Sequence, residues 1–479
     1  MITLLRSKQA QLSITATLLM GLTGCMVGPN YKRPTVPAPP EYRGADASAN
    51  TSGQTAISVG DQKWWEVFGD PQLQELIKKG LQQNYDVRVA AERVIQAQAQ
   101  VRVTRSNQFP TLDGTGGFTS QKNSGASIGG GGTTTSSAPS NIGSLGLSAS
   151  WNLDFWGQYR RASEASRAQL LNYEWARRAV LTTVVMDIAS GYFQLRSYDL
   201  QLEVSRKTLT DYKESLRLTQ ALNTGGSSTL VAVRQAEQLV FTAQAEITEL
   251  EMEIEQEEDV LCALLGESPH PIPRGLALDQ QPHPPAVPAG IPSELLERRP
   301  DIREAEANLM YYNAEIGVAR AAYFPQISLT GSASTESNAL SRLFTGPNYA
   351  WSYGPSMTIP IFNAGQIRSN VKIAESEQRQ YLLTYQQTIA NAFRDVSKDL
   401  IAYRKYREYR EQQEQLTASA QDAVRLTQAL YKEGQDSYLD VLTSETAFFS
   451  AQLNLVTARQ NELSSLVNLY NALGGGWQQ

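Results

Sequence analysis

Apolar residues alternate with small polar residues and glycine in four separate stretches of the chain. In one of them, Leu145, Leu147 and Ala149 alternate with glycine and serine. Successive side chains of a β-strand point to opposite faces, so a period of two predicts strands with one apolar and one polar face. This alternation is typical of membrane-crossing strands, but also of an ordinary antiparallel sheet with one face in water. The predicted strands cover about 111–121, 143–155, 327–336 and 349–361.

The number of predicted strands has a consequence for assembly. A membrane barrel needs about eight strands or more, and an open sheet edge would leave backbone groups unpaired in lipid. If the four strands span a membrane, several chains must share one barrel. Three chains would give twelve strands, although the strand count alone does not require three. A cluster of aromatic residues favours the membrane interpretation, because such residues gather at membrane interfaces; it comprises Trp151, Phe155, Trp156, Tyr349, Trp351 and Tyr353.

Long helices are predicted after each pair of strands. Leu181, Ile188 and Leu195 begin a series of apolar residues spaced by seven, within a proline-free stretch from 157 to 222. Roughly 66 helical residues would extend for ~100 Å, and a heptad seam predicts coiled-coil packing. Glycine-containing turns make each pair of long helices an antiparallel hairpin. The hairpins are predicted at 157–265, with its turn at 223–229, and at 366–473, with its turn at 433–436.

Shorter helices are predicted before the strands, and the whole pattern occurs twice. Helices are expected near 71–82 and 84–107, with a counterpart of the second at 300–323. Phe109-Pro110 and Phe324-Pro325 end the longer ones, because proline disfavours helix at the residue before it. The sequence Arg-Leu-Thr-Gln-Ala-Leu at 217–222 recurs letter for letter at 425–430.

Upstream matches confirm that this repetition is not confined to one motif. Asp86 and Arg88 correspond to Asp301 and Arg303 at a slightly different spacing, and the Gly/Ser/Thr-rich run 125–140 reads as a loop that is longer in the first copy. The chain is therefore predicted to be an internal duplication. Its predicted parts are a first repeat at 71–265, a Pro-rich linker at 266–292, a second repeat at 293–473 and a tail at 474–479.

The N-terminus has the layout of a secretory leader. Arg6 and Lys8 precede an apolar run, which ends in the lipobox Leu22-Thr-Gly-Cys25. A leader of residues 1–24 is predicted, with lipid attachment at Cys25, whereas a secretory leader with a chance cysteine is the alternative. Met26, in place of the aspartate that signals inner-membrane retention, favours the outer membrane. Residues 25–70 would form an extended, lipid-anchored segment.

Composition excludes several classes of function. The net charge is −6 and becomes more negative without the leader, which argues against nucleic acid as a partner. Cys262 lies among apolar residues and is interpreted as a buried small hydrophobe, while His270 and His283 lie among prolines without the spacing of a metal site. With no phosphate-binding loop and no Ser-His-Asp arrangement, the chain is predicted not to be an enzyme and to need no cofactor and no metal.

Three segments of the chain resemble those of TolC-like outer-membrane efflux factors. Trp64-Trp-Glu-Val-Phe-Gly-Asp-Pro-Gln-Leu73 is similar to the family's opening signature. The segments Arg299–Glu306 and Ala322–Pro325 are similar to the start of its second repeat. The lipobox, together with Pro29–Pro34, resembles the NodT-type lipoprotein branch that serves RND-type drug pumps.

This resemblance implies an α+β membrane protein in the outer membrane of a Gram-negative cell. A homotrimer would form a twelve-stranded β-barrel, with four strands per chain, continued through the periplasm by a long antiparallel α-helical coiled-coil barrel. It would act as a passive, gated duct for drugs or other small molecules. Implied partners are a periplasmic adaptor protein, an inner-membrane RND-type pump and outer-membrane lipids.

The hairpin tips are the predicted place for a gate or for adaptor contact. Of the repeated hexapeptides, Arg217, Thr219, Arg425 and Thr427 are the polar candidates, whereas coiled-coil packing would explain the leucines. Gly226 and Gly434 would permit the turns. By resemblance, an acidic ring is expected near the second tip, but Gln428 stands where an aspartate would be expected. The acidic candidates nearby are Asp422, Glu433, Asp436 and Asp440.

Other functions remain compatible with parts of the pattern. A duct of this type could serve type I secretion or metal efflux. A structural periplasmic lipoprotein rod would keep the coiled coils but would need no alternating strands. An enzyme hidden in the linker region is the least favoured alternative, since residues for catalysis are missing.

Overall fold

The computed structural model of the chain describes residues 26–37, 39, 42–44, 63–122, 139–282 and 292–477. Cys25, His283 and most of the predicted loop 125–140 lie outside these ranges. The chain divides into two compact units, the first from 1–34, 95–171 and 307–383, and the second from 35–94, 172–306 and 384–479. These units do not coincide with the two predicted repeats, because each takes segments from both.

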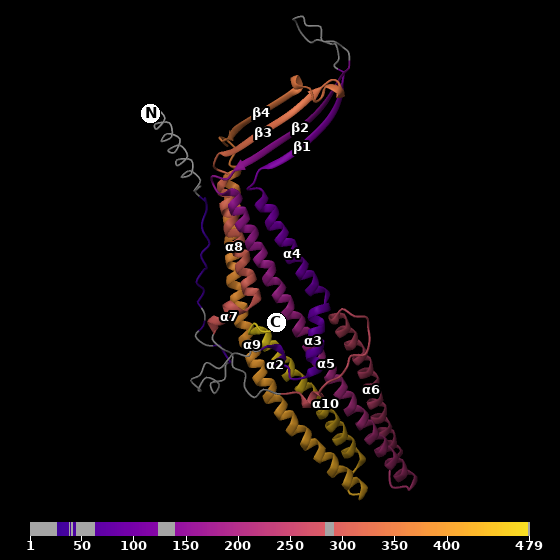
Figure 1. Cartoon of the computed structure of the whole chain (residues 1–479). Helices are drawn as coiled ribbons and strands as arrows, with labels where there is room; N and C mark the ends of the chain where they lie inside the picture. The colour runs from indigo at the N-terminus through magenta and orange to yellow at the C-terminus, as the bar shows by residue number, and fades with distance from the viewer. Residues whose placement is uncertain are drawn as a thin grey trace. The chain divides into compact units, whose positions relative to one another are not determined.

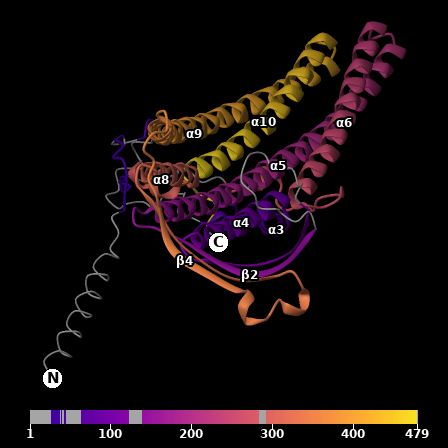
Figure 2. The same ribbon diagram turned by 90° about the horizontal axis from the view of Figure 1, so that it is seen from above.

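The first unit contains one four-stranded sheet (Figure 1). Its strands are β1 (Thr111–Gln121), β2 (Ser140–Leu153), β3 (Gln326–Ser337) and β4 (Tyr349–Thr358). They lie side by side in chain order, and each neighbouring pair is antiparallel. The sheet is visibly curved when seen from above (Figure 2). Two short 3-10 helices, η3 (Leu340–Arg342) and η4 (Gly346–Asn348), lie between β3 and β4.

The register of the strands gathers apolar residues on one face of the sheet. Leu147 pairs with Gly114 on one side and with Ala333 on the other, and Ala333 pairs in turn with Trp351. Directly opposed residues of antiparallel strands share a face, so this row is apolar across all four strands. The large side chains on this face are mostly exposed; they are Leu112, Phe118, Leu145, Leu147, Trp151, Leu329, Tyr349, Trp351, Tyr353 and Met357.

The opposite face of the sheet carries hydroxyl groups and glycines. Ser332 lies opposite Ser352 with 2.8 Å between their hydroxyl oxygens, and Ser328 lies 2.6 Å from Ser356 in the same way. The sheet is therefore amphipathic, as the period of two predicts. The fourth strand was predicted too long: β4 ends at Thr358, because Pro360 has no N–H with which to continue a ladder.

Short helices precede the strands. They are α2 (Trp64–Val67), α3 (Pro71–Gln83), α4 (Tyr85–Ser106), α7 (Pro292–Arg298) and α8 (Pro300–Ala321). Asp70 is the N-cap of α3, where its side chain accepts a hydrogen bond from the backbone N–H of Gln72. The sequence pattern did not predict α2 or α7, which are short.

The second unit holds the ends of two helical hairpins. The first hairpin pairs α5 (Gln158–Thr224) with α6 (Leu230–Leu265), and the second pairs α9 (Gln366–Lys432) with α10 (Tyr438–Ala472). Figures 1 and 2 show α6 beside α5 and α10 beside α9. The two hairpins pack on each other through a buried cluster; its members are Tyr212, Leu239, Val240, Ala243 and Phe449.

Part of the predicted linker lies within the second unit and is packed there. The carboxylate of Asp70 is fully buried and accepts hydrogen bonds, each of 2.9 Å, from the Tyr192 hydroxyl, the Leu276 N–H and the Gln281 amide. Arg274 forms ion pairs with Asp199 and Glu258. The 3-10 helix η2 (Leu278–Gln280) follows, with Leu278 buried. The described linker residues are thus fixed by polar contacts.

Cys262 is buried, as predicted, with its sulfur 2.8 Å from Nδ1 of His270, and burial raises the pKa of its thiol. Across the described ranges, no helix combines the length and the apolar character that a bilayer crossing needs.

Candidate functional site

The tips of the two hairpins have the same backbone geometry. At the first tip the Gly226 N–H donates to the Asn223 carbonyl and the Ser227 N–H donates to the Leu222 carbonyl. At the second tip the N–H groups of 434 and 435 donate in the same way to the carbonyls of 431 and 430. This is a Schellman cap, which needs a left-handed residue at the helix end. Gly226 and Gly434 supply it, with φ of 77° and 72°.

The arginines of the repeated hexapeptide are exposed and paired within their own helices. Arg217 donates to both carboxylate oxygens of Glu214, at 2.9 and 2.6 Å, and Arg425 lies 3.4 Å from Asp422. The side chains of Arg217 and Arg425 are 74% and 70% exposed. The Arg217 hydrogen bond lowers the pKa of Glu214. Since neither arginine packs into a core, both remain available for contact with another molecule.

The threonines of the hexapeptide are in different surroundings. Thr219 is fully buried and its hydroxyl donates to the Ser215 carbonyl, so its side chain does not face a partner. Thr427 is half-buried, and its hydroxyl lies 2.7 Å from that of Ser444 on α10. Thr427 therefore joins the two helices of the second hairpin.

A buried carboxyl group lies next to Gln428. The Gln428 amide donates at 2.8 Å to Glu445 of α10, whose exposed fraction is 4%. Burial raises the pKa of Glu445, while hydrogen bonds from Gln428 and Ser215 oppose the shift and the charge of Asp211 adds to it. Sequence reasoning missed Glu445 as a tip residue. The available signal was its place in the buried row of α10, which is Tyr438, Val441, Glu445 and Phe449.

Glu445 also marks the contact between the two hairpins. The Tyr212 hydroxyl of α5 donates to its backbone carbonyl at 3.3 Å. Nearer the tips, the hydroxyl oxygens of Ser228 and Tyr431 are 3.3 Å apart, and the Tyr431 ring meets that of Tyr438 at 5.5 Å. Burial raises the pKa of Tyr438 to about 12. Polar contacts therefore hold the first hairpin to the second close to both turns.

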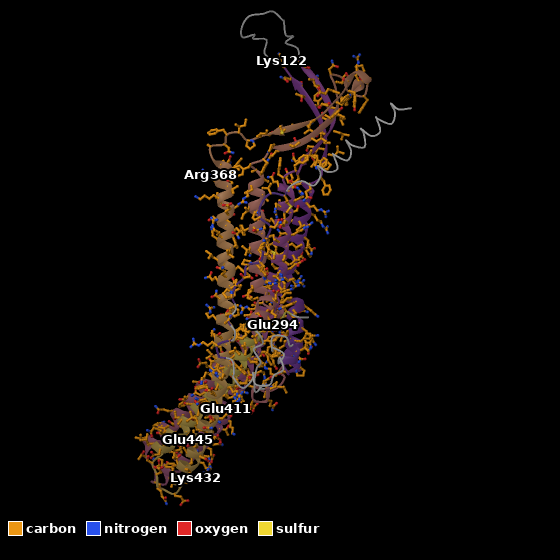
Figure 3. The ribbon with its side chains drawn as sticks, turned by 90° about the vertical axis from the view of Figure 1, so that its left-hand side faces the viewer. Lys122, Glu294, Arg368, Glu411, Lys432 and Glu445 are labelled. Carbon is orange, nitrogen blue, oxygen red and sulfur yellow. The ribbon has the colours of Figure 1, made fainter. Side chains whose placement is uncertain are left out.

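Beside these contacts lies a groove of about 1240 Å³ between α5 and α9. Its lining carries charges of both signs and includes five of the predicted tip residues: Arg217, Asp422, Arg425, Gln428 and Glu433. Glu445 lies at the groove too. Figure 3 shows Lys432 and Glu445 near the ends of the long helices, and Glu411 farther from these ends.

Asp436 and Asp440 are placed differently from the other acidic candidates. Neither lines the groove. The Ser437 hydroxyl donates to the Asp440 carboxylate at 2.5 Å, and this bond lowers the pKa of Asp440. Asp436 accepts from the Ser437 N–H at 2.8 Å. In this conformation both carboxylates organise the first turn of α10.

Among the residues that the structure describes, no three His, Cys, Asp or Glu side chains are placed so that they could share a metal ion. Cys25, the predicted lipid attachment residue, lies outside the described residues.

Comparison with known proteins gives consistent matches over almost the whole chain. A sequence model of the family described as outer membrane efflux protein matches residues 76–267 and 291–475. The cation efflux system protein CusC of Escherichia coli O6:H1 is 37% identical over 461 residues, which cover 96% of this chain and 97% of CusC. The solvent efflux pump outer membrane protein SrpC of Pseudomonas putida is 36% identical over 476 residues, which cover 98% of this chain and 99% of SrpC. The open state of the Neisseria gonorrhoeae MtrE outer membrane channel matches with a TM-score of 0.83 and 31% identity, covering 95% of this chain and 99% of MtrE.

Proposed function

The chain belongs to the outer membrane efflux protein family, and from this premise we propose that three copies form the gated outer-membrane duct of a tripartite efflux system. The duct is passive and performs no catalysis. The observation that carries this proposal is the sheet, which has an apolar face, a hydroxyl-rich face and two free edges among the described residues.

The edge strands support closure of a barrel between chains. Neighbouring strands alternate in direction, so β1 and β4 of one chain run antiparallel to each other. Placing β4 of one copy beside β1 of the next continues the same alternation. Three copies give twelve strands, which is an even number within the range of membrane barrels. The apolar face then faces lipid, and the face with Ser332 and Ser328 lines the lumen.

The helices support continuation of the barrel as a tunnel. β2 leads within five residues into α5, and β4 leads within eight into α9, so each strand pair feeds one hairpin. Four long helices per chain give twelve in the trimer. The two hairpins have closely similar helix lengths, with 67 residues in both α5 and α9, and 36 and 35 in α6 and α10. This correspondence supports an internal duplication.

The hairpin tips are proposed to bear the gate and the site for the periplasmic adaptor. Arg217 and Arg425 are exposed at the groove and can contact an adaptor helix. Gln428, Thr427 and Glu445 hold the second hairpin closed, with Asp440 ordering its turn. Thr219 and the two glycines support the tips structurally.

Localisation in the outer membrane follows from the family. We propose that Cys25 carries a lipid that adds a second anchor to the barrel. An inner-membrane RND-type pump would supply the energy and select the cargo. Relatives named for cation efflux and for solvent efflux are similar to this chain to the same degree, so the duct itself does not require one cargo class.

Single-channel conductance of the purified protein in a planar bilayer tests the proposal. We expect a small resting conductance, which increases when Gln428→Leu removes the hydrogen bond to Glu445. Arg394→Ala is a matched control, because Arg394 is exposed on α9 away from the tip and pairs with Asp395. Absence of conductance from every variant, with a mass corresponding to folded single chains, would favour the periplasmic rod and reject the duct.

A further inference from the structure

The first described residues of the chain occupy a site built by both repeats. The Val27 N–H donates to the Trp156 carbonyl at 3.1 Å, and the Asn313 amide donates to the Pro29 carbonyl at 3.0 Å. Trp156 lies between β2 and α5, and Asn313 lies on α8. Residues 26–30 are therefore bound on two sides, although they lie in an otherwise irregular segment.

Arg161 is the centre of this site. Its side chain is 1% exposed, although it carries a charge. Its Nε donates to the Val27 carbonyl at 3.1 Å, and its Nη2 donates to the Gly28 carbonyl at 3.1 Å and to the Asn30 side-chain oxygen at 2.8 Å. The remaining Nη1 pairs with Glu164 at 2.6 Å. A buried charge is costly unless it is fully paired, and three of the four acceptors of Arg161 belong to residues 27–30.

Close backbone contacts complete the site. Gly28 has a φ of 99°, and a Cβ at this position would lie 2.5 Å from the Gly317 Cα. A Cβ at Gly317 would lie 2.7 Å from Arg161 Cγ and 2.9 Å from the Val27 carbonyl oxygen. A Cβ at Gly157 would lie 2.7 Å from Met26 Cγ. The segment 26–30 therefore fits against its site only because glycines stand at the points of closest contact, Gly28 in the segment and Gly157 and Gly317 in the site.

Aromatic residues lie beside the site. The rings of Trp156 and Phe324 are stacked with centroids 4.7 Å apart, and Nε1 of Trp156 donates to the Pro325 carbonyl at 2.8 Å. Of the two residues, tryptophan is the type that is enriched at the boundary between lipid and water. Both lie directly next to ends of strands whose apolar face is proposed to contact lipid.

We propose that Trp156, Gly157, Arg161, Asn313 and Gly317 form a binding site for the chain's own residues 26–30, whose task is to hold the acyl group of Cys25 at the boundary between barrel and tunnel. This inference rests on the proposed lipid attachment at Cys25. Consecutive Cα atoms are about 3.8 Å apart, so binding of Met26 next to Gly157 restricts where an acyl group on the preceding residue can enter the membrane. Arg161 acts as a positioning residue.

Trypsin release of the N-terminal peptide tests this site in the full-length protein in detergent micelles. Lys32 is exposed and follows the bound segment, and Arg33-Pro34 resists trypsin. We expect slow cleavage after Lys32 in the unchanged protein and at least tenfold faster cleavage in Arg161→Ala. Gly317→Ala keeps the arginine in the sequence but adds a Cβ that clashes with Arg161 and with the Val27 carbonyl, and should also accelerate cleavage. Arg167→Ala, which removes an exposed arginine from the same helix, should leave the rate unchanged.

A double-mutant cycle separates the site from general destabilisation. If Arg161 acts through the segment, Asn30→Ala and Arg161→Ala together should accelerate release by much less than the product of their separate effects. Unchanged release in Arg161→Ala, or fully multiplicative effects in the double variant, would overturn the proposal. The mass of the released peptide reports acylation of Cys25 independently, so failure of the lipid assignment is distinguishable from failure of the site.

Discussion

The amide of Gln428 on α9 donates a hydrogen bond of 2.8 Å to the buried carboxyl group of Glu445 on α10. Gln428 stands where an acidic residue was expected, and the acid lies instead on the facing helix. Because an amide can donate while a carboxylate cannot, the pair is attractive, whereas two acids in these positions would repel each other. The second hairpin is therefore held together at a titratable position close to its tip.

Acidification is expected to tighten this contact. Burial raises the pKa of Glu445 above its ordinary value of 4.5. When folding raises the pKa of a carboxyl group, the protonated group stabilises the folded contact. This stabilisation is fully present below the ordinary pKa and is lost as the pH increases through the raised pKa. Single-channel conductance should therefore increase as the pH rises above the ordinary pKa of 4.5 and through the raised pKa of Glu445. Glu445→Gln should abolish this dependence and keep the low conductance at neutral pH.

Glu237 provides a matched control for that experiment. It occupies the position of Glu445 in the first hairpin, but it pairs with Arg234 at 2.6 Å and its side chain is 26% exposed. Glu237→Gln should leave the pH dependence of conductance in place. Hydrogen exchange in α10 is a second measurement. At neutral pH we expect exchange to be tenfold slower in Glu445→Gln, which corresponds to a free energy of local opening that is higher by about 1.4 kcal/mol. A pH response that persists in Glu445→Gln would contradict the assignment.

The exposed arginines of the tips should affect binding and leave stability unchanged. Surface ion pairs such as Arg217–Glu214 and Arg425–Asp422 contribute little to folding, whereas arginine is enriched among the residues that dominate interfaces. Arg217→Ala combined with Arg425→Ala should weaken adaptor binding by roughly tenfold or more, with an unchanged thermal midpoint. Binding to the immobilised adaptor and thermal unfolding measure the two quantities. Equal affinity in both proteins would remove the arginines from the docking site.

Adjacent residues of β3 should respond in opposite ways to the same substitution. Ser332 lies on the hydroxyl-rich face and Ala333 on the apolar face, opposite Trp351. Ala333→Arg places a charge in lipid and should cost about 2–4 kcal/mol near the bilayer centre, which reduces assembled protein in the outer membrane. Ser332→Arg should assemble normally and change conductance and ion selectivity. The reverse result would mean that the lumen lies on the apolar side.

Asp70 is expected to be essential for stability of the linker region. Asp70→Ala would leave the Tyr192 hydroxyl and the Leu276 N–H without their acceptor, and would remove one of the two acceptors of the Gln281 amide, which also donates to the Leu276 carbonyl. Each buried donor without a partner costs about 1–3 kcal/mol, so the two donors should cost roughly 2–6 kcal/mol in thermal unfolding. Trypsin should then cleave after Arg274 much faster. Asp86→Asn, at an exposed position of α4, serves as the control and should change neither measurement.

Local patterns account for most of the helices and strands. The heptads and turn glycines of the hairpins are signals within a few residues. The first long helix ends at Thr224, two residues beyond the end of the stretch 157–222 from which it was predicted. Period-two alternation located all four strands. The predicted end of β4 was wrong because alternation continues to Ile361, whereas the ladder ends at Thr358, two residues before Pro360.

The contacts of the site depended on packing that a single sequence does not reveal. Glu237 and Glu445 are equivalent in the repeat, but only one of them is buried. Arg161 could not be recognised, because three of its four acceptors lie more than 130 residues away in the chain. Thr219 was predicted to face a partner because of its polarity, although its hydroxyl is satisfied within its own helix.

The difference between Glu237 and Glu445 has a consequence for stoichiometry. Each chain supplies two hairpins with the same turn but with different acid chemistry, so the proposed trimer would present six tips of two alternating kinds. A ring of six identical adaptors would then meet two distinct surfaces and bind in two modes. An adaptor that recognises only one kind of tip would bind three to a trimer. Counting adaptors per channel by native mass spectrometry would therefore show whether the duct is used with six-fold or three-fold symmetry.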